Sequence, residues 1–415
     1  MTKVIKQFIL IHLLLLGLFN GLQSQSGVFS GTDLLQGKSK VSIPFNFVNN
    51  FIILDVKIFG TIPVHLIFDT GAEHVILFKK EYTDILQVTY DKRIPIMGSD
   101  LSRQIFALIT RNAVLEISNL PPTPYDILVL EEDYFNLEEV IGTSIDGLIG
   151  GGFFKNLIVQ IDYNNLKLTL HDPASFKIPH GFTILPIKIK INKPYIDAEA
   201  CLQNGSVVQV DLLIDTGAGV PLLLHTNSHP SLKLPDQYIR GKLGMGLGGY
   251  LEGFIGRINK LSVGEIDFPG IITSFQDIKT EFLANKDRFR NGILGNQLLS
   301  RFMVYFDYNR GQLLLKARKS KNKPFEMDKS GLVIFAYGID FNQFIIKDII
   351  PGSPASESDI VPGDELVNLQ GMPISFYSLS GINSILQKKA GKRVRLVVKR
   401  DGKNLKRHFY LRELI

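Results

Sequence analysis

The 415-residue chain is poor in sulfur and indole, with one cysteine, Cys201, and no tryptophan. A single thiol cannot close an intramolecular disulfide, so the folded chain must be stabilised by the size of its cores. Cys201 lies inside a strand-like segment, which predicts a buried, inert thiol rather than a catalytic one. A chain of this length is expected to form two or three domains.

A strong excess of one charge is also lacking. There are 46 Lys and Arg residues against 40 Asp and Glu residues, which gives a formal net charge of +6. Much of the basic excess lies in residues 316–323 and 388–407, where no aromatic side chains are interleaved with the basic ones. Nucleic-acid surfaces usually combine both kinds of side chain. The pattern therefore predicts solvated faces and a basic linker, and we expect no nucleic-acid partner.

Long hydrophobic runs are scarce, and the one near the N-terminus, over residues 8–19, is short for a membrane span. It follows two lysines and precedes small and polar residues, which is the layout of a secretory signal over residues 1–24. We expect export to an extracytoplasmic location, either periplasmic, in the cell envelope or secreted, with membrane attachment only if the signal is uncleaved. Residues 25–42 are interpreted as a short N-terminal extension, and their composition does not support an inhibitory propeptide.

Helical periodicity is scarce before residue 375, and short strand-like runs take its place. Segments such as "FIILDVKIF", "LKLTLHD" and "VQVDLLID" are rich in β-branched residues and are separated by Gly, Asn and Pro. The pattern predicts a mainly β fold for most of the chain.

One unusual stretch, "LIFDTGAEHVIL" (66–77), places an acid directly after an apolar run and follows it with Thr-Gly-Ala. "LLIDTGAGVPLL" (212–223) repeats it. A buried carboxylate is costly unless it is hydrogen-bonded or shares its charge with a partner. Each stretch alone would therefore bury an unpaired carboxylate, and the acid of the other stretch is a possible partner for it.

The spacing between Asp69 and Asp215 recurs downstream to within one residue. "DGLIGGGFFKNLIVQIDYNNLKLTL" (146–170) is echoed by "NGILGNQLLSRFMVYFDYNRGQLLL" (291–315) in the same phase. Conserved phase over this length indicates a duplicated β unit. We assign the two copies to residues 43–172 and 181–318, with a linker at residues 173–180.

Two lobes related by a pseudo-two-fold axis would bring Asp69 and Asp215 together at their shared interface. Like charges at short range raise one pKa, so such a pair shares one proton. One carboxylate can then accept a proton from water while the other donates one to a carbonyl oxygen. Asp69 and Asp215 are the predicted catalytic residues.

The residues around each acid suit a crowded carboxylate pair. Glycine allows close approach of the two loops, a threonine hydroxyl can hydrogen-bond across the interface, and alanine is small. An apolar-apolar-glycine segment further on in each copy is suited to passing beneath the acid-bearing loop. The predicted supporting residues are Thr70, Gly71, Ala72 and Gly150 in the first copy and Thr216, Gly217, Ala218 and Gly295 in the second.

With these paired motifs, the segment from about 43 to 318 resembles the pepsin/retropepsin-type aspartic proteases, as a bacterial form with both lobes in one chain. The resemblance implies a bilobal double β-barrel, a β-hairpin flap over the cleft, and hydrolysis of peptide bonds by an activated water without a covalent intermediate. It implies no cofactor and no metal, and we expect a monomer. The lobes are smaller than usual pepsin lobes and lack their disulfides.

Glu73 and His74 stand where the second copy has Gly219 and Val220. They either form a surface turn or influence the two acids or the substrate.

Flap candidates lie between the acid and the apolar-apolar-glycine segment of each copy. The first is residues 95–106, which contain Gly98, and the second is residues 241–256. In the second, Gly246, Gly248 and Tyr250 are candidates for contact with substrate, and a solvent-exposed turn is the alternative. No helix pattern follows "GMGLGG", so a phosphate-binding loop is not favoured.

After the basic linker at 319–330, the chain departs from the repeat. "FIIKDIIPGSPASESDIVPGDELVNLQGMPI" (344–374) indicates a strand, a turn, a short helix and a second strand. Apolar residues at helical spacing follow over residues 378–391, and a hairpin strand over 393–403. The order resembles that of bacterial PDZ domains and defines a small α+β module over residues 331–415.

The PDZ resemblance implies a peptide-binding groove. Gly331, Leu332, Val333 and Ile334 would form the loop that cradles a peptide's terminal carboxylate with backbone amides. The groove between the following strand and the helix would take a peptide C-terminus or an internal segment as an added strand. A module used only for docking or stabilisation is the alternative.

The leading hypothesis is thus an exported aspartic endopeptidase acting on protein or peptide substrates, with a PDZ domain that recruits them. The rival hypothesis is a catalytically silent peptide-binding scaffold that retains the protease fold. A metallohydrolase is disfavoured because the eight histidines show no HExxH spacing, and a serine hydrolase because no G-x-S-x-G elbow is present.

Overall fold

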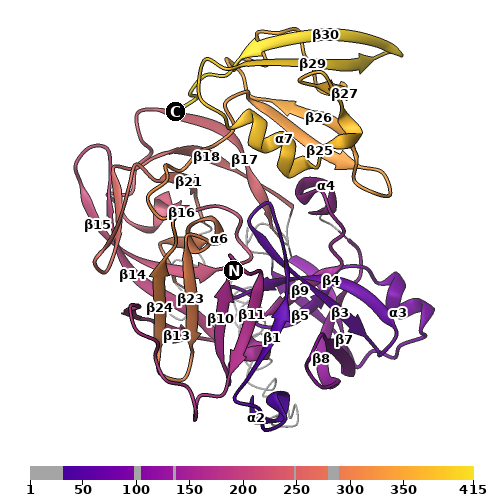
Figure 1. Ribbon diagram of the computed structural model, residues 1–415, viewed down its shortest axis with the longest axis vertical. Coiled ribbons are helices and arrows are strands. Elements are labelled where there is room, and N and C mark those ends of the chain that lie inside the picture. Colours follow the sequence, from indigo (N-terminus) through magenta and orange to yellow (C-terminus); the bar gives the residue numbers. More distant parts are fainter. Residues whose placement is uncertain (1–30, 98–103, 134–136, 247–248, 279–288) are drawn as a thin grey trace, which may run out of the picture.

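A computed structural model describes residues 31–97, 104–133, 137–246, 249–278 and 289–415. The predicted signal over residues 1–24, together with Gly98 and Gly248, lies outside these ranges. The described chain is mainly β, and Figure 1 shows a lower body of twisted sheets with a smaller C-terminal domain above it. In the described ranges, no helix is both long enough and apolar enough to cross a bilayer.

The first repeat forms an eight-stranded sheet in the order β2-β3-β4-β9-β5-β8-β7-β6. Its β4 and β9 run parallel, whereas β9 and β5 run antiparallel, so β9 is inserted between two strands that are close in sequence. The strands are β2 (Asn46–Val48), β3 (Phe51–Ile58), β4 (Ile62–Asp69), β5 (Val75–Leu77), β6 (Lys92–Met97), β7 (Gln104–Ile117), β8 (Thr123–Leu130) and β9 (Gly147–Gly150).

The second repeat forms a ten-stranded sheet with the same inserted arrangement, because β22 lies parallel to β15 and antiparallel to β16. The strands are β13 (Lys188–Lys190), β14 (Lys193–Cys201), β15 (Val207–Asp215), β16 (Leu222–His225), β17 (Tyr238–Gly246), β18 (Gly249–Arg257), β19 (Lys260–Val263), β20 (Ile266–Pro269), β21 (Ile272–Gln276) and β22 (Gly292–Gly295).

A third sheet takes strands from both repeats, in the order β1-β11-β10-β23-β24-β12. Its centre is the antiparallel pair β10 and β23, one strand from each copy. The two lobes are therefore joined by backbone hydrogen bonds as well as by side chains. The strands are β1 (Lys40–Pro44), β10 (Ile158–Asp162), β11 (Lys167–His171), β12 (Thr183–Pro186), β23 (Phe302–Asp307) and β24 (Gln312–Ala317).

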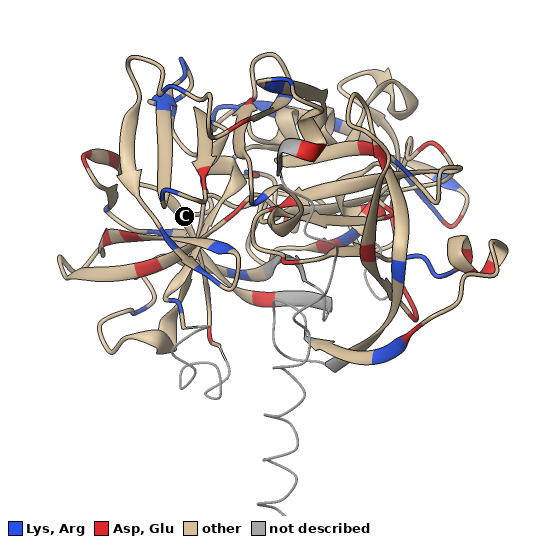
Figure 2. Cartoon of the chain, turned by 90° about the horizontal axis from the view of Figure 1, so that it is seen from below, with Lys and Arg blue, Asp and Glu red and all other residues tan. Residues whose placement is uncertain are grey.

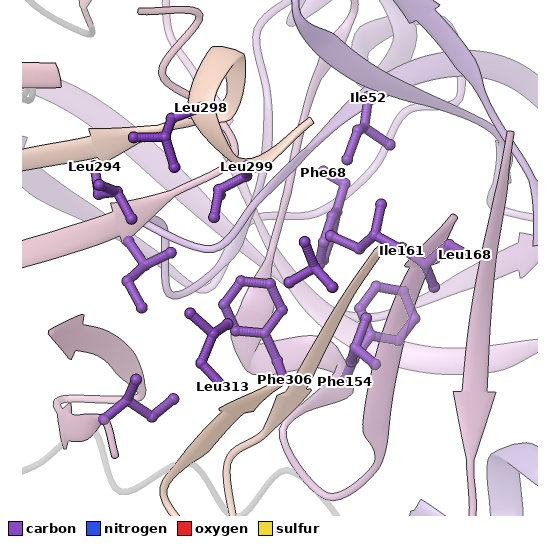
Figure 3. Close-up of a cluster of buried hydrophobic side chains, with 14 of the residues drawn as sticks. Ile52, Phe68, Phe154, Ile161, Leu168, Leu294, Leu298, Leu299, Phe306 and Leu313 are labelled. Atoms are coloured by element: carbon purple, nitrogen blue, oxygen red, sulfur yellow. The ribbon is translucent and has the colours of Figure 1, made fainter. Parts of the chain in front are cut away.

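One apolar core extends beneath both lobes. Figure 3 shows Phe68 and Phe154 of the first repeat in the same cluster as Phe306 and Leu313 of the second. Phe68 and Phe154 pack edge to face with their ring centroids 5.7 Å apart. A fully buried side chain of this size contributes about 1.5–3 kcal/mol to folding. In this chain, core size takes the place of disulfides.

The C-terminal domain has its own sheet and its own apolar core. Its strands are β25 (Leu332–Tyr337), β26 (Gln343–Ile349), β27 (Glu365–Leu369), β28 (Met372–Pro373), β29 (Arg393–Arg400) and β30 (Lys403–Tyr410). Residues 351–355 form the predicted turn, and turns continue to residue 359 without a helix, so the short helix predicted between this turn and Gly363 is wrong. Asp359, with its positive φ, and Pro362 oppose a helix in this short segment.

Within the described ranges, the helices are short and most of them lie close to the end of a strand. The α-helices are α2 (Gly31–Leu35), α3 (Glu81–Ile85), α4 (Leu137–Ile141), α6 (Asn296–Leu299) and α7 (Leu379–Leu386), and the 3₁₀ turns are η1 (Gly151–Phe154), η2 (Thr226–Ser228) and η3 (Ile374–Phe376). Figure 2 shows Lys and Arg interspersed with Asp and Glu along the described elements rather than gathered in one sector.

One further sequence-based expectation needs correction: Cys201 is half-buried rather than buried, because it is the last residue of β14. Two segments outside the predicted lobes also pack on the main core. Leu34 and Leu35 of α2, within the predicted extension over residues 25–42, are buried there. In the predicted basic linker, the Phe325 ring is buried in the same core, and the Arg301 guanidinium lies over it, 3.3 Å from its centroid.

Candidate active site

Asp69 and Asp215 occupy equivalent places in the two lobes. Asp69 ends β4 and Asp215 ends β15, and each is paired in register with the last glycine of a parallel neighbour, Gly150 or Gly295. The apolar residues before each acid are buried in the strand, while the Thr-Gly-Ala that follows turns the chain away. Duplication thus places each acid at the end of a buried strand, facing the other lobe.

Thr70 and Thr216 lock the two acid-bearing loops together. Each hydroxyl accepts a hydrogen bond from the backbone N–H of the other threonine, at 3.0 and 3.1 Å. Each also donates to a carbonyl of the opposite strand: Thr70 to Ile214 at 2.7 Å and Thr216 to Phe68 at 2.8 Å. Both threonines are fully buried, so these four bonds form in a water-free environment.

Gly71 and Gly217 let each loop approach the opposite carboxylate. A methyl group built at Gly71 would lie 2.6 Å from the carboxyl carbon of Asp215, and one at Gly217 would lie 2.5 Å from that of Asp69. Any larger residue would push the loops apart. The structure therefore brings the two predicted acids together across the pseudo-two-fold axis.

The carboxylates are held by backbone amides. Asp69 Oδ1 accepts hydrogen bonds from the N–H groups of Gly71 at 2.7 Å and Ala72 at 3.0 Å, and Asp215 Oδ1 accepts one from Gly217 at 2.7 Å. Burial raises the pKa of Asp69 well above its ordinary value, and the charge of Asp215 and a hydrogen bond between the two carboxyl groups raise it further. The hydrogen bond from the Gly71 amide opposes this shift but does not cancel it, so the raised pKa favours the protonated form of Asp69.

Gly150 and Gly295 lie directly beneath the acid-bearing loops. A methyl group at Gly295 would lie 2.0 Å from the carbonyl oxygen of Val220, and one at Gly150 would lie 2.7 Å from the carbonyl carbon of Glu73. No Cβ fits at either position. The apolar-apolar-glycine segments thus form the floor of the site.

Glu73 lies at the lobe interface rather than in a free surface turn. Asn192 of the second lobe donates from Nδ2 to Glu73 Oε1 at 3.2 Å. In the other half, Asn50 Nδ2 donates to the carbonyl oxygen of Gly219 at 3.1 Å. The tips of the equivalent hairpins β2–β3 and β13–β14 therefore each reach across to the opposite acid-bearing loop.

Lys193 is the charged residue that the sequence analysis missed. Lys193 is the first residue of β14, and the equivalent first residue of β3 is Phe51. The Phe51 ring lies against Gly219, because a methyl group built on Gly219 would be 3.0 Å from it. The charge of Lys193 partly offsets the raised pKa of Asp69. Burial and Arg290 lower the pKa of Lys193 itself, while Asp69, Glu73 and Asp215 act in the opposite direction. A lysine in place of an apolar residue at an equivalent strand start was the available signal.

Tyr163 and Tyr308 occupy equivalent positions in the two repeats, but their hydroxyl groups have different surroundings. The Tyr163 hydroxyl donates to Asn296 Oδ1. The counterpart of Asn296 in the first lobe is Gly151, and a methyl group there would lie 2.8 Å from the Tyr308 hydroxyl. That buried hydroxyl has no hydrogen-bond partner within the described chain. Burial and the charge of Asp69 raise the pKa of Tyr308.

Both flap candidates are β-hairpins as far as the structure describes them. In the first lobe β6 pairs with β7, and Gly98 lies outside the described residues between them. In the second lobe β17 pairs with β18, with Gly246 opposite Gly249 and Tyr250 opposite Met245, while Gly248 lies outside the described residues. Their contact with a substrate stays a prediction.

The predicted carboxylate-binding loop of the C-terminal domain is already partly occupied. Gly331 has φ +80°, and its N–H donates to Asp328 Oδ1 at 2.6 Å. The N–H of Leu332, the first residue of β25, donates to Ser330 Oγ at 3.1 Å. Val333 and Ile334 follow in the same strand, which is at the edge of its sheet. Among the described residues, no group of three or more His, Cys, Asp or Glu is arranged to hold a metal ion.

A family model described as "PDZ domain" matches residues 345–400. The C-terminal module is a PDZ domain. The match begins within β26 and ends with β29, so it covers the centre of the sheet and α7. With this match, the predicted fold class, mainly β with a C-terminal PDZ domain, is confirmed.

Curated relatives share only a short segment with this chain. Candidate zinc metalloproteases of Brucella suis and Brucella melitensis are each 36% identical over 72 residues, which is 17% of this chain. The chain spans 18% of the length of these relatives.

Solved structures with a related arrangement include an aspartic proteinase from Irpex lacteus, with a TM-score of 0.41 and 13% sequence identity, covering 68% of this chain and 99% of that one. Basic 7S globulin from soybean has a TM-score of 0.42 and 8% identity, covering 69% of this chain and 97% of that one.

Proposed function

We propose that this chain is an exported aspartic endopeptidase, and that its two acids are Asp69 and Asp215. Two observations support this best. The carboxyl group of each acid lies against the glycine of the opposite acid-bearing loop, Gly71 or Gly217. Four reciprocal hydrogen bonds of the two threonines join these loops. A scaffold without chemistry has no need for two half-buried carboxyl groups in hydrogen-bond contact, because the repulsion between their charges destabilises the fold.

In the proposed reaction Asp69, whose pKa is raised by burial, is the proton donor and Asp215 is the base. A water between the carboxyl groups attacks the peptide carbonyl carbon and gives its proton to Asp215, while protonated Asp69 gives its proton to the carbonyl oxygen. The resulting gem-diol collapses: the C–N bond breaks, the amine nitrogen takes the proton from Asp215, and a hydroxyl proton returns to Asp69. Both acids therefore end in the protonation states in which they started.

Substrate capture is proposed to involve the PDZ domain and the two hairpins. An edge strand such as β25 can bind an extended peptide through its backbone. The β6–β7 and β17–β18 hairpins are proposed to cover the substrate. Export rests on the layout of residues 1–24 alone.

The test is cleavage of an unfolded protein such as casein by the full chain between pH 3 and pH 7. Asp69→Asn and Asp215→Asn should each lower kcat by on the order of 10²- to 10⁴-fold with circular dichroism unchanged. Asp197→Asn, at an exposed aspartate of β14, is the matched control and should retain activity. A statine-type inhibitor should block the unaltered chain. Cleavage that survives either dyad substitution would refute the assignment, and an unaltered chain without activity would favour the silent scaffold.

A further inference from the structure

Strand β25, which forms one edge of the PDZ sheet, is in contact with the first lobe. Strand β25 pairs with β26 on one side, and α4 of the first lobe lies against it. Figure 1 shows α4 beside β25 and below α7, where the body meets the C-terminal domain. A peptide added to this sheet would have to lie along the same strand.

Specific contacts fix α4 at the start of α7. Gly142, the residue after α4, has φ +79°, and a methyl group there would lie 2.8 Å from Cβ of Leu379, the first residue of α7. The Ser380 hydroxyl donates to Asn49 Oδ1 at 2.7 Å. Asn49 in turn donates from Nδ2 to the carbonyl oxygen of Ile141, in the last turn of α4, at 2.8 Å. One side chain therefore holds both helices.

The turn that carries Asn49 also supports the second acid-bearing loop. Asn49 and Asn50, with φ of 46° and 69°, form the tight turn between β2 and β3. Asn50 donates to the carbonyl of Gly219, and its own carbonyl accepts from Asn296 Nδ2 at 2.7 Å. Gly219 lies four residues after Asp215, so this turn contacts the PDZ helix on one side and the proposed active site on the other.

The path from α4 to the first acid is equally short. Glu138 of α4 accepts hydrogen bonds from Lys79 Nζ at 2.7 Å and from the N–H of Ile145 at 3.1 Å. Strand β9 begins two residues later at Gly147 and ends opposite Asp69. Displacement of α4 would therefore disturb the floor beneath Asp69.

The carboxylate end of the groove has an internal occupant as well. Asp328 accepts hydrogen bonds from the backbone N–H groups of Ser330 at 2.9 Å and Gly331 at 2.6 Å, and from the Ser330 hydroxyl. It thus provides the negative charge that the C-terminus of a bound peptide would bring to this loop.

We propose that the PDZ groove is closed in cis, with α4 covering β25 and Asp328 filling part of the amide loop, and that a peptide binds only when α4 is released. Since the Asn49–Asn50 turn and β9 connect this contact to both acids, release also couples peptide capture to the active site. That second statement rests on the proposed function, whereas the closure of the groove does not.

The test uses the full chain and two substitutions that attack the contact from opposite sides. Asn49→Asp keeps the acceptor for Ser380 but sets a carboxylate oxygen against the Ile141 carbonyl. Ser380→Arg places a bulky side chain at the same contact. Ser384→Arg, one turn further along α7 at an exposed position, is the matched control.

The probe is a fluorescein-labelled peptide of residues 137–145, LEEVIGTSI, with a free C-terminus. Asn49→Asp and Ser380→Arg should bind it at least tenfold more tightly than the unaltered chain and Ser384→Arg do, and hydrogen exchange at the β25 amides should be at least tenfold faster. Equal binding by all four proteins, or β25 exchange that the substitutions leave unchanged, overturns the closed groove. Neither measurement depends on catalysis, so failure of the proposed reaction would leave the result readable; a change in casein cleavage tests the coupling separately.

Discussion

At the scale of single residues, the raised pKa of Asp69 lowers the free energy of unfolding at neutral pH. Its raised pKa means that the folded state holds a proton that the unfolded state releases above about pH 3.8. Stability must therefore fall as the pH rises from that value towards the folded-state pKa of Asp69. An asparagine keeps the acceptor for the Gly71 and Ala72 amides without ever ionising.

We therefore predict that Asp69→Asn raises the melting temperature at pH 7 and that this advantage shrinks as the pH falls to 3. Calorimetry between pH 3 and pH 7 measures the melting temperatures of the variant and the unaltered chain. Asp197→Asn, at an exposed aspartate, is the control. A stabilisation independent of pH would contradict the linkage.

The unequal tyrosines give a second prediction. Tyr163→Phe leaves Asn296 Oδ1 buried without its donor, so it should lower the free energy of unfolding by about 1–3 kcal/mol. Tyr308→Phe removes a buried hydroxyl that has no partner within the described chain, and should change stability by less than about 1 kcal/mol. Urea unfolding of both variants decides it, and equal losses would show that the two lobes are equivalent here.

At the scale of elements, the two acid-bearing loops behave as one unit. Thr70→Val or Thr216→Val would leave a buried carbonyl and a buried amide unpaired, so each should cost about 2–4 kcal/mol. The two variants remove different bonds, two each, but both loosen the same pair of loops, so the double variant should cost less than the sum of the single losses. Thr61→Val, at an exposed turn, is the control for denaturant unfolding, and additive losses would argue against a shared network.

At the scale of the whole molecule, one core runs through both lobes and a second lies within the PDZ domain. We predict two thermal transitions in scanning calorimetry. Ile382→Ala in α7 should destabilise only the PDZ transition, by about 2–5 kcal/mol, whereas Ile161→Ala in β10 should destabilise the other. A single transition that moves with both substitutions would mean that the docking of α4 and the buried Phe325 merge the two cores into one cooperative unit.

The sequence alone determined the β class, the duplication and the pairing of Asp69 with Asp215, because strand periodicity and a repeat in constant phase are properties of the chain itself. The hairpins β6–β7 and β17–β18 lie in the segments predicted from local pattern, whereas their role as flaps and the binding of a peptide at Gly331 stay predictions. The short helix predicted after the Pro-Gly-Ser-Pro-Ala turn is absent because turn-forming residues outweighed a weak helical pattern.

Only the tertiary structure showed which contacts the differing residues of the two copies make and which helix of the first lobe lies against β25. The roles of three residues depend on groups that are distant in the sequence and lie in the other lobe: Lys193, Asn296 and Tyr308. The contact of Asn49 with Ser380 joins residues that no local pattern connects. Composition and spacing record what one segment favours, whereas the partner of a buried polar group is set by which distant segments the packed cores bring together.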